Sequence, residues 1–160
     1  VEIKKLNAHT ENVLLGTYSL GKAQRLTRLI NDHCPDRKVA VHFQILPLHQ
    51  LHEKWNINLG KYHIYTRKMM KEVEKNYVYL VPPLTFKSYS RATNVCRAFA
   101  SGWKNLQNHN DLQLLISDHV DWNDILKMIE QVKPTEVWTV HGDGEYLKAH
   151  FKGKIPIKAL

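Results

Sequence analysis

The sequence lacks several features that would assign a protein to a particular class. Its two cysteines, Cys34 and Cys96, lie far apart and without the spacing of metal ligands, so a reducing compartment such as the cytoplasm is favoured. No apolar run approaches the length of about 18 residues that would indicate a membrane-spanning helix. The amino end, VEIKKLNAHTENV, has neither an initiator Met nor the apolar region of a signal peptide. We therefore expect a chain that begins partway through a longer protein.

Several catalytic and nucleotide-binding motifs are also missing. The sequence has neither a P-loop nor a G-x-G-x-x-G fingerprint. The segment ASGW at residues 100–103 lacks the first glycine of the G-x-S-x-G motif, which excludes the usual serine-hydrolase pattern. His49 and His52 share a helix spacing, but no carboxylate follows at a suitable distance, so a solvated helix face is favoured for both.

The charge of the chain indicates what kind of partner it has. The 160 residues are 43% hydrophobic and 24% charged, which is the balance of a globular protein with one or two compact units. With 23 Lys and Arg against 15 Asp and Glu, the net charge of +8 favours an anionic partner such as nucleic acid. Basic charge that serves solubility alone is the alternative.

Apolar runs alternate with helical patterns along the chain. The runs predict strands at residues 12–17, 38–43, 77–81, 95–100, 112–116, 136–140 and 155–158. The helical patterns lie at residues 20–30, 48–55, 66–76 and 122–132, the first with Ser19 as its expected N-cap. This alternation predicts an α/β fold with a largely parallel sheet covered on both faces. The polar, unpatterned residues 84–94 are the best candidate for a boundary between two units.

In a parallel sheet, ligands bind at the carboxyl ends of the strands. Four loops are expected there, at residues 18–22, 101–103, 117–119 and 141–144. The first combines Ser19 and a helix N-terminus with Lys22 and Arg25, and this combination suits a phosphate. An ordinary capped helix with basic residues on its surface explains the same pattern.

The segment SDHVDW at residues 117–122 has two interpretations. Asp121 can cap the helix that begins at Trp122, with Asp118 adding charge near that helix end and His119 as a polar strand end. Alternatively, a histidine held by a neighbouring carboxylate can act as a general acid toward a leaving oxygen, or as a metal ligand. His141 also follows an apolar strand, so it is either a ligand or a strand-end residue.

Four segments together resemble one family. Residues 15–26 (LGTYSLGKAQRL), 99–103 (FASGW), 117–122 (SDHVDW) and 137–142 (VWTVHG) resemble, in order, segments of the metallo-β-lactamase-fold nucleases that carry a β-CASP region. The branch that they resemble comprises bacterial exonucleases described as DNA ligase-associated or as RNA 3′-end processing factors. Four ordered matches over nearly the whole chain are more specific than any one of them.

The resemblance implies roles for particular residues. His119 takes the place of the histidine of the second β-CASP motif, which lies by the scissile phosphate and protonates the leaving group, with Asp118 beside it. His141 takes the place of a histidine that ligates one of two zinc ions. The residues implied to face the phosphate or the nucleic acid are Ser19, Lys22, Arg25, Ser101 and Ser117.

The resemblance also implies how the chain divides and what it lacks. Residues 1–93 correspond to part of the β-CASP region, and residues 94–160 to the carboxyl-terminal part of the metallo-β-lactamase αββα fold. The H-x-H-x-D-H motif and the other metal ligands of the family belong upstream. Because zinc takes three or four protein ligands, a site for two zinc ions is incomplete in this chain.

The function implied is that of the carboxyl-terminal portion of a zinc-dependent exonuclease, which hydrolyses phosphodiester bonds of DNA or RNA. Without its upstream half we expect this portion to be inactive. The implied partners are nucleic acid, that upstream half, and a DNA ligase or helicase, in RNA processing or DNA repair. Two alternatives remain: a non-catalytic, basic nucleic-acid-binding module, and a partner-docking module whose apolar face is covered only in a complex.

Overall fold

The computed structural model describes residues 2–66, 68–69, 76–140 and 142–160. The chain forms two compact units, Val1–Asp118 and His119–Leu160. These units are defined by their compactness. The boundary predicted between residues 93 and 94 separates two regions of a family fold, and it stays a prediction. No helix among the described residues is long and apolar enough to cross a membrane.

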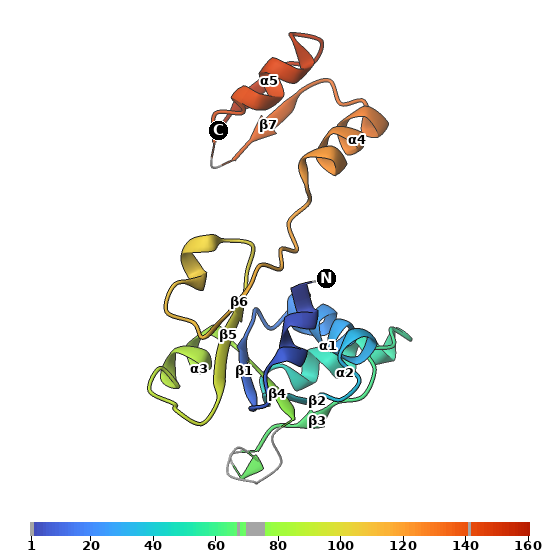
Figure 1. Cartoon of the computed structure of the whole chain (residues 1–160). Helices are drawn as coiled ribbons and strands as arrows, with labels where there is room; N and C mark the ends of the chain where they lie inside the picture. Colours follow the sequence, from blue (N-terminus) through green and yellow to red (C-terminus); the bar gives the residue numbers. More distant parts are fainter. Residues whose placement is uncertain (1, 67, 70–75, 141) are drawn as a thin grey trace. The chain divides into compact units, whose positions relative to one another are not determined.

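The first unit is built on a sheet of parallel strands (Figure 1). The strands are β1 Val13–Gly16, β2 Lys38–Val41, β3 His63–Ile64, β4 Tyr77–Val81, β5 Cys96–Ala100 and β6 Leu112–Leu114. Their order across the sheet is β3-β2-β4-β1-β5-β6, and every pairing is parallel. The predicted α/β class is confirmed, and the carboxyl ends of all these strands meet at one edge of the sheet.

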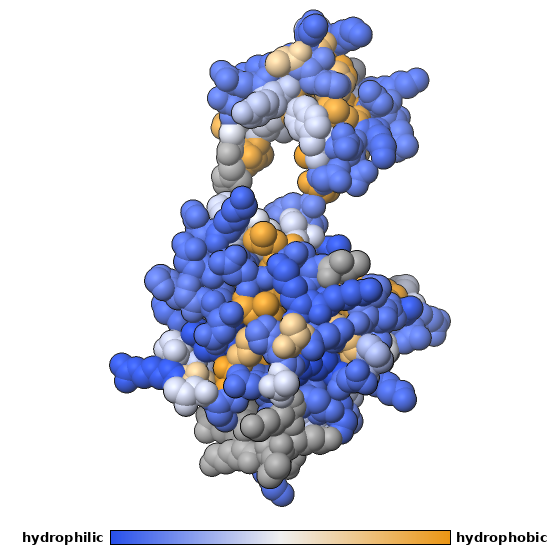
Figure 2. Space-filling view, viewed as in Figure 1, coloured by the Kyte–Doolittle hydropathy of each residue, from blue (hydrophilic) through white to orange (hydrophobic). Residues whose placement is uncertain are grey.

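Helices cover both faces of this sheet. The elements are η1 Glu2–Ala8, α1 Lys22–His33, α2 Leu46–Lys54, α3 Pro83–Ser88 and the 3-10 helix η3 Lys104–Gln107. Figure 1 shows α1, α2 and the amino-terminal helix gathered on one side of the strands, with α3 on the other. Hydrophilic residues cover most of the visible surface, with small hydrophobic patches between them (Figure 2).

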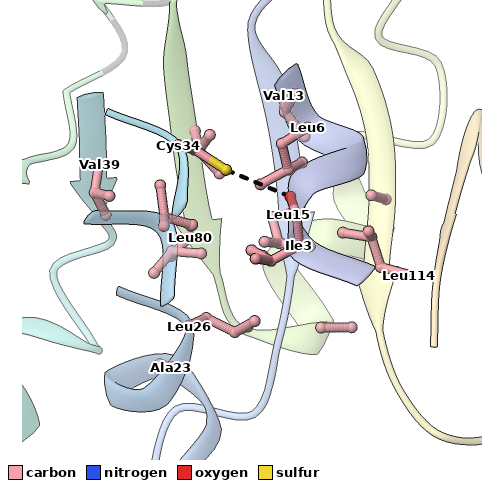
Figure 3. Close-up of a cluster of buried hydrophobic side chains, with 14 of the residues drawn as sticks. Ile3, Leu6, Val13, Leu15, Ala23, Leu26, Cys34, Val39, Leu80 and Leu114 are labelled. Atoms are coloured by element: carbon pink, nitrogen blue, oxygen red, sulfur yellow. Dashed lines mark hydrogen bonds between the residues drawn. The ribbon is translucent and has the colours of Figure 1, made fainter. Parts of the chain in front are cut away.

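The core beneath α1 is tightly filled (Figure 3). Ile3 and Leu6 of η1, Leu15 of β1 and Leu26 of α1 are all completely buried there. The thiol of Cys34 donates a hydrogen bond to the carbonyl oxygen of Ile3 at 3.4 Å. Each side chain of this size contributes about 1.5–3 kcal/mol by leaving water. This face is therefore a structural core.

The opposite core, beneath α3, is rich in aromatic residues. Tyr79 of β4, Phe86 of α3 and Phe99 of β5 pack in it against Leu14. A Cβ atom at Gly16 would lie 2.4 Å from the Phe99 ring and 2.6 Å from the Phe86 ring. The absence of a side chain at Gly16 therefore allows these rings to pack directly on β1.

The second unit has a much smaller core. It consists of α4 Trp122–Val132, β7 Val137–Thr139, α5 Glu145–Phe151 and β8 Ile157–Ala159, with β7 and β8 paired in parallel. Of its described hydrophobic residues, only Ile129 and Phe151 are buried, whereas Met128 and Val132 are 53% and 69% exposed. A two-stranded sheet with so little burial has marginal stability alone.

The two principal helices begin in different ways. Asp121 caps α4 as predicted, because its Oδ1 accepts a hydrogen bond from the backbone N–H of Asp124 at 2.9 Å. The N-cap predicted at Ser19 is wrong. Gly21, with a φ of 76°, precedes α1 and no side chain caps this helix. A tight turn precedes α1, so Leu20 lies before the helix and is exposed rather than part of its buried face.

Two other predictions differ from the structure, and a third lies largely outside the described residues. Residues 84–94 are not unpatterned, because they begin with most of α3 and lead into β5 of the same sheet, whereas the domain boundary expected there stays a prediction. His49 does not lie on a solvated face but is completely buried on α2. The helix expected at residues 66–76 falls largely on residues outside the described ranges. The helix α5 was not predicted.

Candidate functional site

The candidate site lies at the carboxyl edge of the sheet in the first unit. Residues 18–22 follow β1, residues 101–103 follow β5, and residues 117–118 follow β6. Because β5 lies between β1 and β6, three of the four predicted loops come to the same edge. The predicted phosphate-facing residues on these three loops are Ser19, Lys22, Ser101 and Ser117.

Two basic residues of α1 hold the loop that follows β6. The Lys22 ammonium donates to the carbonyl oxygen of Ile116 at 3.1 Å and lies 3.7 Å from Oδ2 of Asp118. The Arg25 guanidinium donates from Nη1 to the Ser117 carbonyl oxygen and to Oδ1 of Asp118, both at 2.8 Å. Lys22, Arg25 and Asp118 form what we call the Asp118 clamp. The clamp ties the end of β6 to the start of α1, although more than ninety residues separate them in sequence.

The two cations of the clamp differ in burial. The Lys22 side chain is only 7% exposed, so its charge depends on Asp118 and the Ile116 carbonyl group for the stabilisation that water no longer provides. The Arg25 side chain is 53% exposed, and an ion pair of this kind contributes only about 0–1 kcal/mol. Arg25 is therefore the cation of the clamp that an anion in solvent can reach, whereas Lys22 is a fixed structural charge.

The clamp carries a net positive charge and retains donors for an anion. A guanidinium group has five N–H donors, and both bonds of Arg25 use Nη1 alone. A pocket of about 220 Å³ beside Arg25 is lined by Ser117 and by Glu2, whose carboxylate is paired with the Lys5 ammonium at 2.8 Å.

The loop after β5 packs directly against the loop after β6. A Cβ atom at Gly102 would lie 2.8 Å from Cβ of Ser117 and 3.0 Å from its Oγ. Ser101 is 2% exposed, and its hydroxyl oxygen accepts a hydrogen bond from the backbone N–H of Trp103 at 3.1 Å. Ser101 therefore shapes the loop rather than presenting its hydroxyl group to solvent.

A buried amide that the sequence did not single out supports these loops. The Gln107 side chain donates to the carbonyl oxygens of Phe99 at 2.9 Å and Ser101 at 3.2 Å, and accepts from the backbone N–H of Leu114 at 3.1 Å. It thereby joins the ends of β5 and β6. A glutamine in a polar segment gives no signal of this role, because the role depends on burial.

Two residues central to the predicted chemistry lie beyond this unit. His119 is exposed and begins the second unit, immediately after Asp118. His141 lies outside the described residues. The predicted convergence of these two imidazole groups on one substrate therefore stays a prediction, as do their roles.

Both cysteines have buried thiol groups of low reactivity. Burial raises the pKa of the Cys34 thiol, and it raises the pKa of the Cys96 thiol to about 11. A thiol is nucleophilic only as the thiolate, so neither cysteine is suited to catalysis.

Part of the chain, including one loop of the candidate site, is similar to a known family. Residues 112–155 match the family model described as RMMBL, the Zn-dependent metallo-hydrolase RNA specificity domain. The match agrees with the resemblance to metallo-β-lactamase-fold nucleases. The matched residues include β6, the loop with Ser117 and Asp118, and most of the second unit.

The chain is also similar to a curated protein. The chain is 29% identical over 137 residues to a probable DNA ligase of Opitutus terrae (strain DSM 11246 / JCM 15787 / PB90-1). The alignment covers 81% of this chain but 13% of the relative. The chain thus corresponds to a small part of that protein.

The zinc dependence of the metallo-hydrolase family sets a requirement that the described residues do not meet. They contain no group of three or more His, Cys, Asp or Glu side chains that could hold a metal ion. Asp118 is unsuited to be a ligand in this arrangement, because Arg25 occupies one of its oxygens and Lys22 lies near the other. A metallo-hydrolase site would need ligands from elsewhere.

Proposed function

We propose that this chain is the carboxyl-terminal portion of a zinc-dependent exonuclease that hydrolyses phosphodiester bonds of DNA or RNA. The observation that carries the proposal is the Asp118 clamp. It fixes a loop of the RNA specificity domain, one residue before His119, on a basic edge of the sheet. The match to a Zn-dependent metallo-hydrolase domain supports hydrolysis as the reaction.

In this proposal the clamp positions the phosphate-binding loops and His119 supplies the proton. Arg25 donates hydrogen bonds to the carbonyl oxygen of Ser117 and the carboxylate of Asp118. These bonds hold the backbone immediately before His119 in place. His119 protonates the leaving oxygen of the scissile bond, a role that contributes about 10²–10⁴-fold in rate. Ser19, Arg25 and Ser117 contact the phosphate, and Lys22 and Ser101 hold the loops.

Zinc would be held with His141 as one ligand and with further ligands from an upstream metallo-β-lactamase half. When bound, zinc supplies a water molecule activated for attack at phosphorus. The exposed apolar residues of the second unit, among them Trp122, Met128 and Val132, support the proposal that another part of the protein covers this unit. The name of the curated relative supports a link to DNA ligation.

The test uses the longer protein that includes the upstream half. Labelled single-stranded DNA and RNA oligonucleotides are incubated with it in the presence of zinc and, separately, with a chelator. We expect degradation with zinc alone, complete loss in His141→Ala, and a decrease of about 10²–10⁴-fold in His119→Ala. Full activity in both variants would show that these roles are wrong. The 160-residue chain serves as the inactive control.

A non-catalytic module that binds nucleic acid, or one that docks on a partner protein, is the second candidate. It is favoured by the absence of a metal-binding group among the described residues and by the basic edge at Lys22 and Arg25. Such a module would bind oligonucleotides with a steep salt dependence whatever its metal content. Binding without hydrolysis or metal in every preparation would favour it over the nuclease.

A further inference from the structure

A second feature of the first unit lies apart from the Asp118 clamp. It is a pocket of about 750 Å³ formed by the end of β1, by α3, by β5 and by the segment around η3. The volume falls within the range of about 300–1,000 Å³ that is usual for small-molecule sites. The lining residues that matter here are Tyr18, Phe86, Lys87, Arg97, Phe99 and Asn108.

The pocket has an aromatic wall. The rings of Phe86 and Phe99 are in edge contact, with centroids 5.4 Å apart, and both are buried. Tyr18 contacts Phe99 edge to face at 6.2 Å, yet it remains 52% exposed. An exposed tyrosine held by rings beneath it offers a rigid surface on which a planar group can stack.

The pocket also attracts anions. Arg97 extends from β5 with its guanidinium group 4.7 Å from the centroid of the Phe86 ring. The Nε of Arg97 is buried and has no hydrogen-bond partner among the described residues. Lys87 is exposed at the rim, and no described residue that lines the pocket is acidic. A planar guanidinium group beside a lysine suits a phosphate.

The lining residues around η3 are held in place and include side-chain amides. The backbone N–H of Asp111 donates to the Arg97 carbonyl oxygen at 2.9 Å, and the Asp111 carboxylate accepts from the backbone N–H of Arg97 at 2.7 Å. With the buried Gln107, these bonds hold the segment of Asn105 and Asn108 against β5. Side-chain amides both donate and accept, as the edges of nucleobases do.

We propose that this pocket binds one base and an adjacent phosphate of a single-stranded nucleic acid. The base stacks on Tyr18, the phosphate pairs with Arg97 and Lys87, and the asparagine amides contact the edge of the base. Tyr18 also links the pocket to the candidate site, because the Lys22 ammonium lies 5.8 Å from its ring centroid. The inference extends the proposed action on nucleic acid, but it requires neither zinc nor hydrolysis.

The test measures binding by the 160-residue chain in the presence of a chelator. The probe is a fluorescently labelled deoxyadenosine strand of about 12 nucleotides, compared with an abasic strand of the same length. We expect the strand with bases to bind at least about 10-fold more tightly, and Tyr18→Ala to weaken its binding by about 10-fold. Tyr18→Phe should retain affinity, because stacking needs the ring and not the hydroxyl group.

Matched variants separate the pocket from general basic charge. Arg97→Gln and Lys87→Gln should each weaken binding, whereas Lys54→Gln, which removes an exposed lysine from α2, should leave it unchanged. Trp55→Ala removes another exposed aromatic residue and is the control for Tyr18→Ala. Lys87→Gln is a surface change, so it gives an answer even if Arg97→Gln disturbs folding.

Four results would overturn the inference. Three of them are equal affinity for the strand with bases and the abasic strand, unchanged binding by Tyr18→Ala, and equal loss in the Lys54 and Lys87 variants. Adenosine monophosphate that displaces the strand at equal concentration would show a site for free nucleotides instead, and would also overturn it. The binding assay contains a chelator and no metal. A failure of the longer protein to hydrolyse oligonucleotides therefore would not change the conclusion drawn from binding.

Discussion

His49 should make the stability of the first unit depend on pH. The residue is completely buried, and its Nδ1 lies 3.1 Å from the amide nitrogen of Gln24. That nitrogen can only donate, so Nδ1 accepts and the ring proton is on Nε2, 2.8 Å from the Thr27 hydroxyl oxygen. The Thr27 hydroxyl group donates in turn to the carbonyl oxygen of Ala23 at 3.0 Å. This network fits a neutral imidazole, because a second ring proton, on Nδ1, would face the amide nitrogen of Gln24, which is itself a donor.

The magnitude follows from the pKa. Burial lowers the pKa of His49 from its ordinary value of 6.5 to about 4. Between about pH 6.5 and about pH 4, His49 is protonated in the unfolded chain but neutral in the folded chain. The free energy of unfolding therefore decreases as the pH falls through this range. At about 1.4 kcal/mol per pKa unit, the loss from this residue is about 3 kcal/mol. Burial also lowers the pKa of His42, which adds in the same direction.

Urea unfolding between about pH 7.5 and about pH 4 measures this dependence. The His49→Leu variant is less stable at neutral pH, because Gln24 and Thr27 lose a partner, but its free energy of unfolding should fall less on acidification, by about 3 kcal/mol. His63→Leu, at an exposed position on β3, should keep the slope of the unmodified protein. Equal slopes for the unmodified protein and His49→Leu would refute the reasoning.

Three further predictions concern other positions. Asp121→Ala removes the cap of α4 and should lower the stability of the second unit by about 1 kcal/mol, as measured by thermal unfolding; an unchanged transition would contradict this. Cys34 and Cys96 should react with a thiol reagent only after unfolding, because both are buried, and rapid reaction of the native chain would disprove it. Gly102→Ala should displace Ser117 and slow hydrolysis by the longer protein, and an unaltered rate would argue against the packing of these loops.

The sequence predicts the elements whose signals are local. Helix α4 begins at Trp122 and ends at Val132 as expected, because a strong helical periodicity follows an aspartate cap. Helix α3 was missed because the sequence of residues 84–94 shows no helical pattern, although Pro83 stands in the first turn of this helix, where proline is favoured. Helix α5 has only 7 residues, too few for a clear periodic pattern.

The candidate site could be predicted only in part. Parallel strands bring their carboxyl ends to one edge, and this rule placed the loops with Lys22 and Ser117 together. It could not predict that Lys22 and Arg25 would both serve Asp118, because this pairing depends on tertiary structure. The burial of His49 was missed for the same reason, since its partners lie on a different helix.

The central claim gives His119 and His141 different tasks, proton transfer and zinc binding. The most direct test measures zinc content and oligonucleotide hydrolysis in the same preparations of the longer protein. The account predicts that His119→Ala keeps its zinc while hydrolysis slows by about 10²–10⁴-fold, and that His141→Ala loses both zinc and hydrolysis. Loss of zinc in His119→Ala, or full zinc content with a normal rate in His141→Ala, would contradict it.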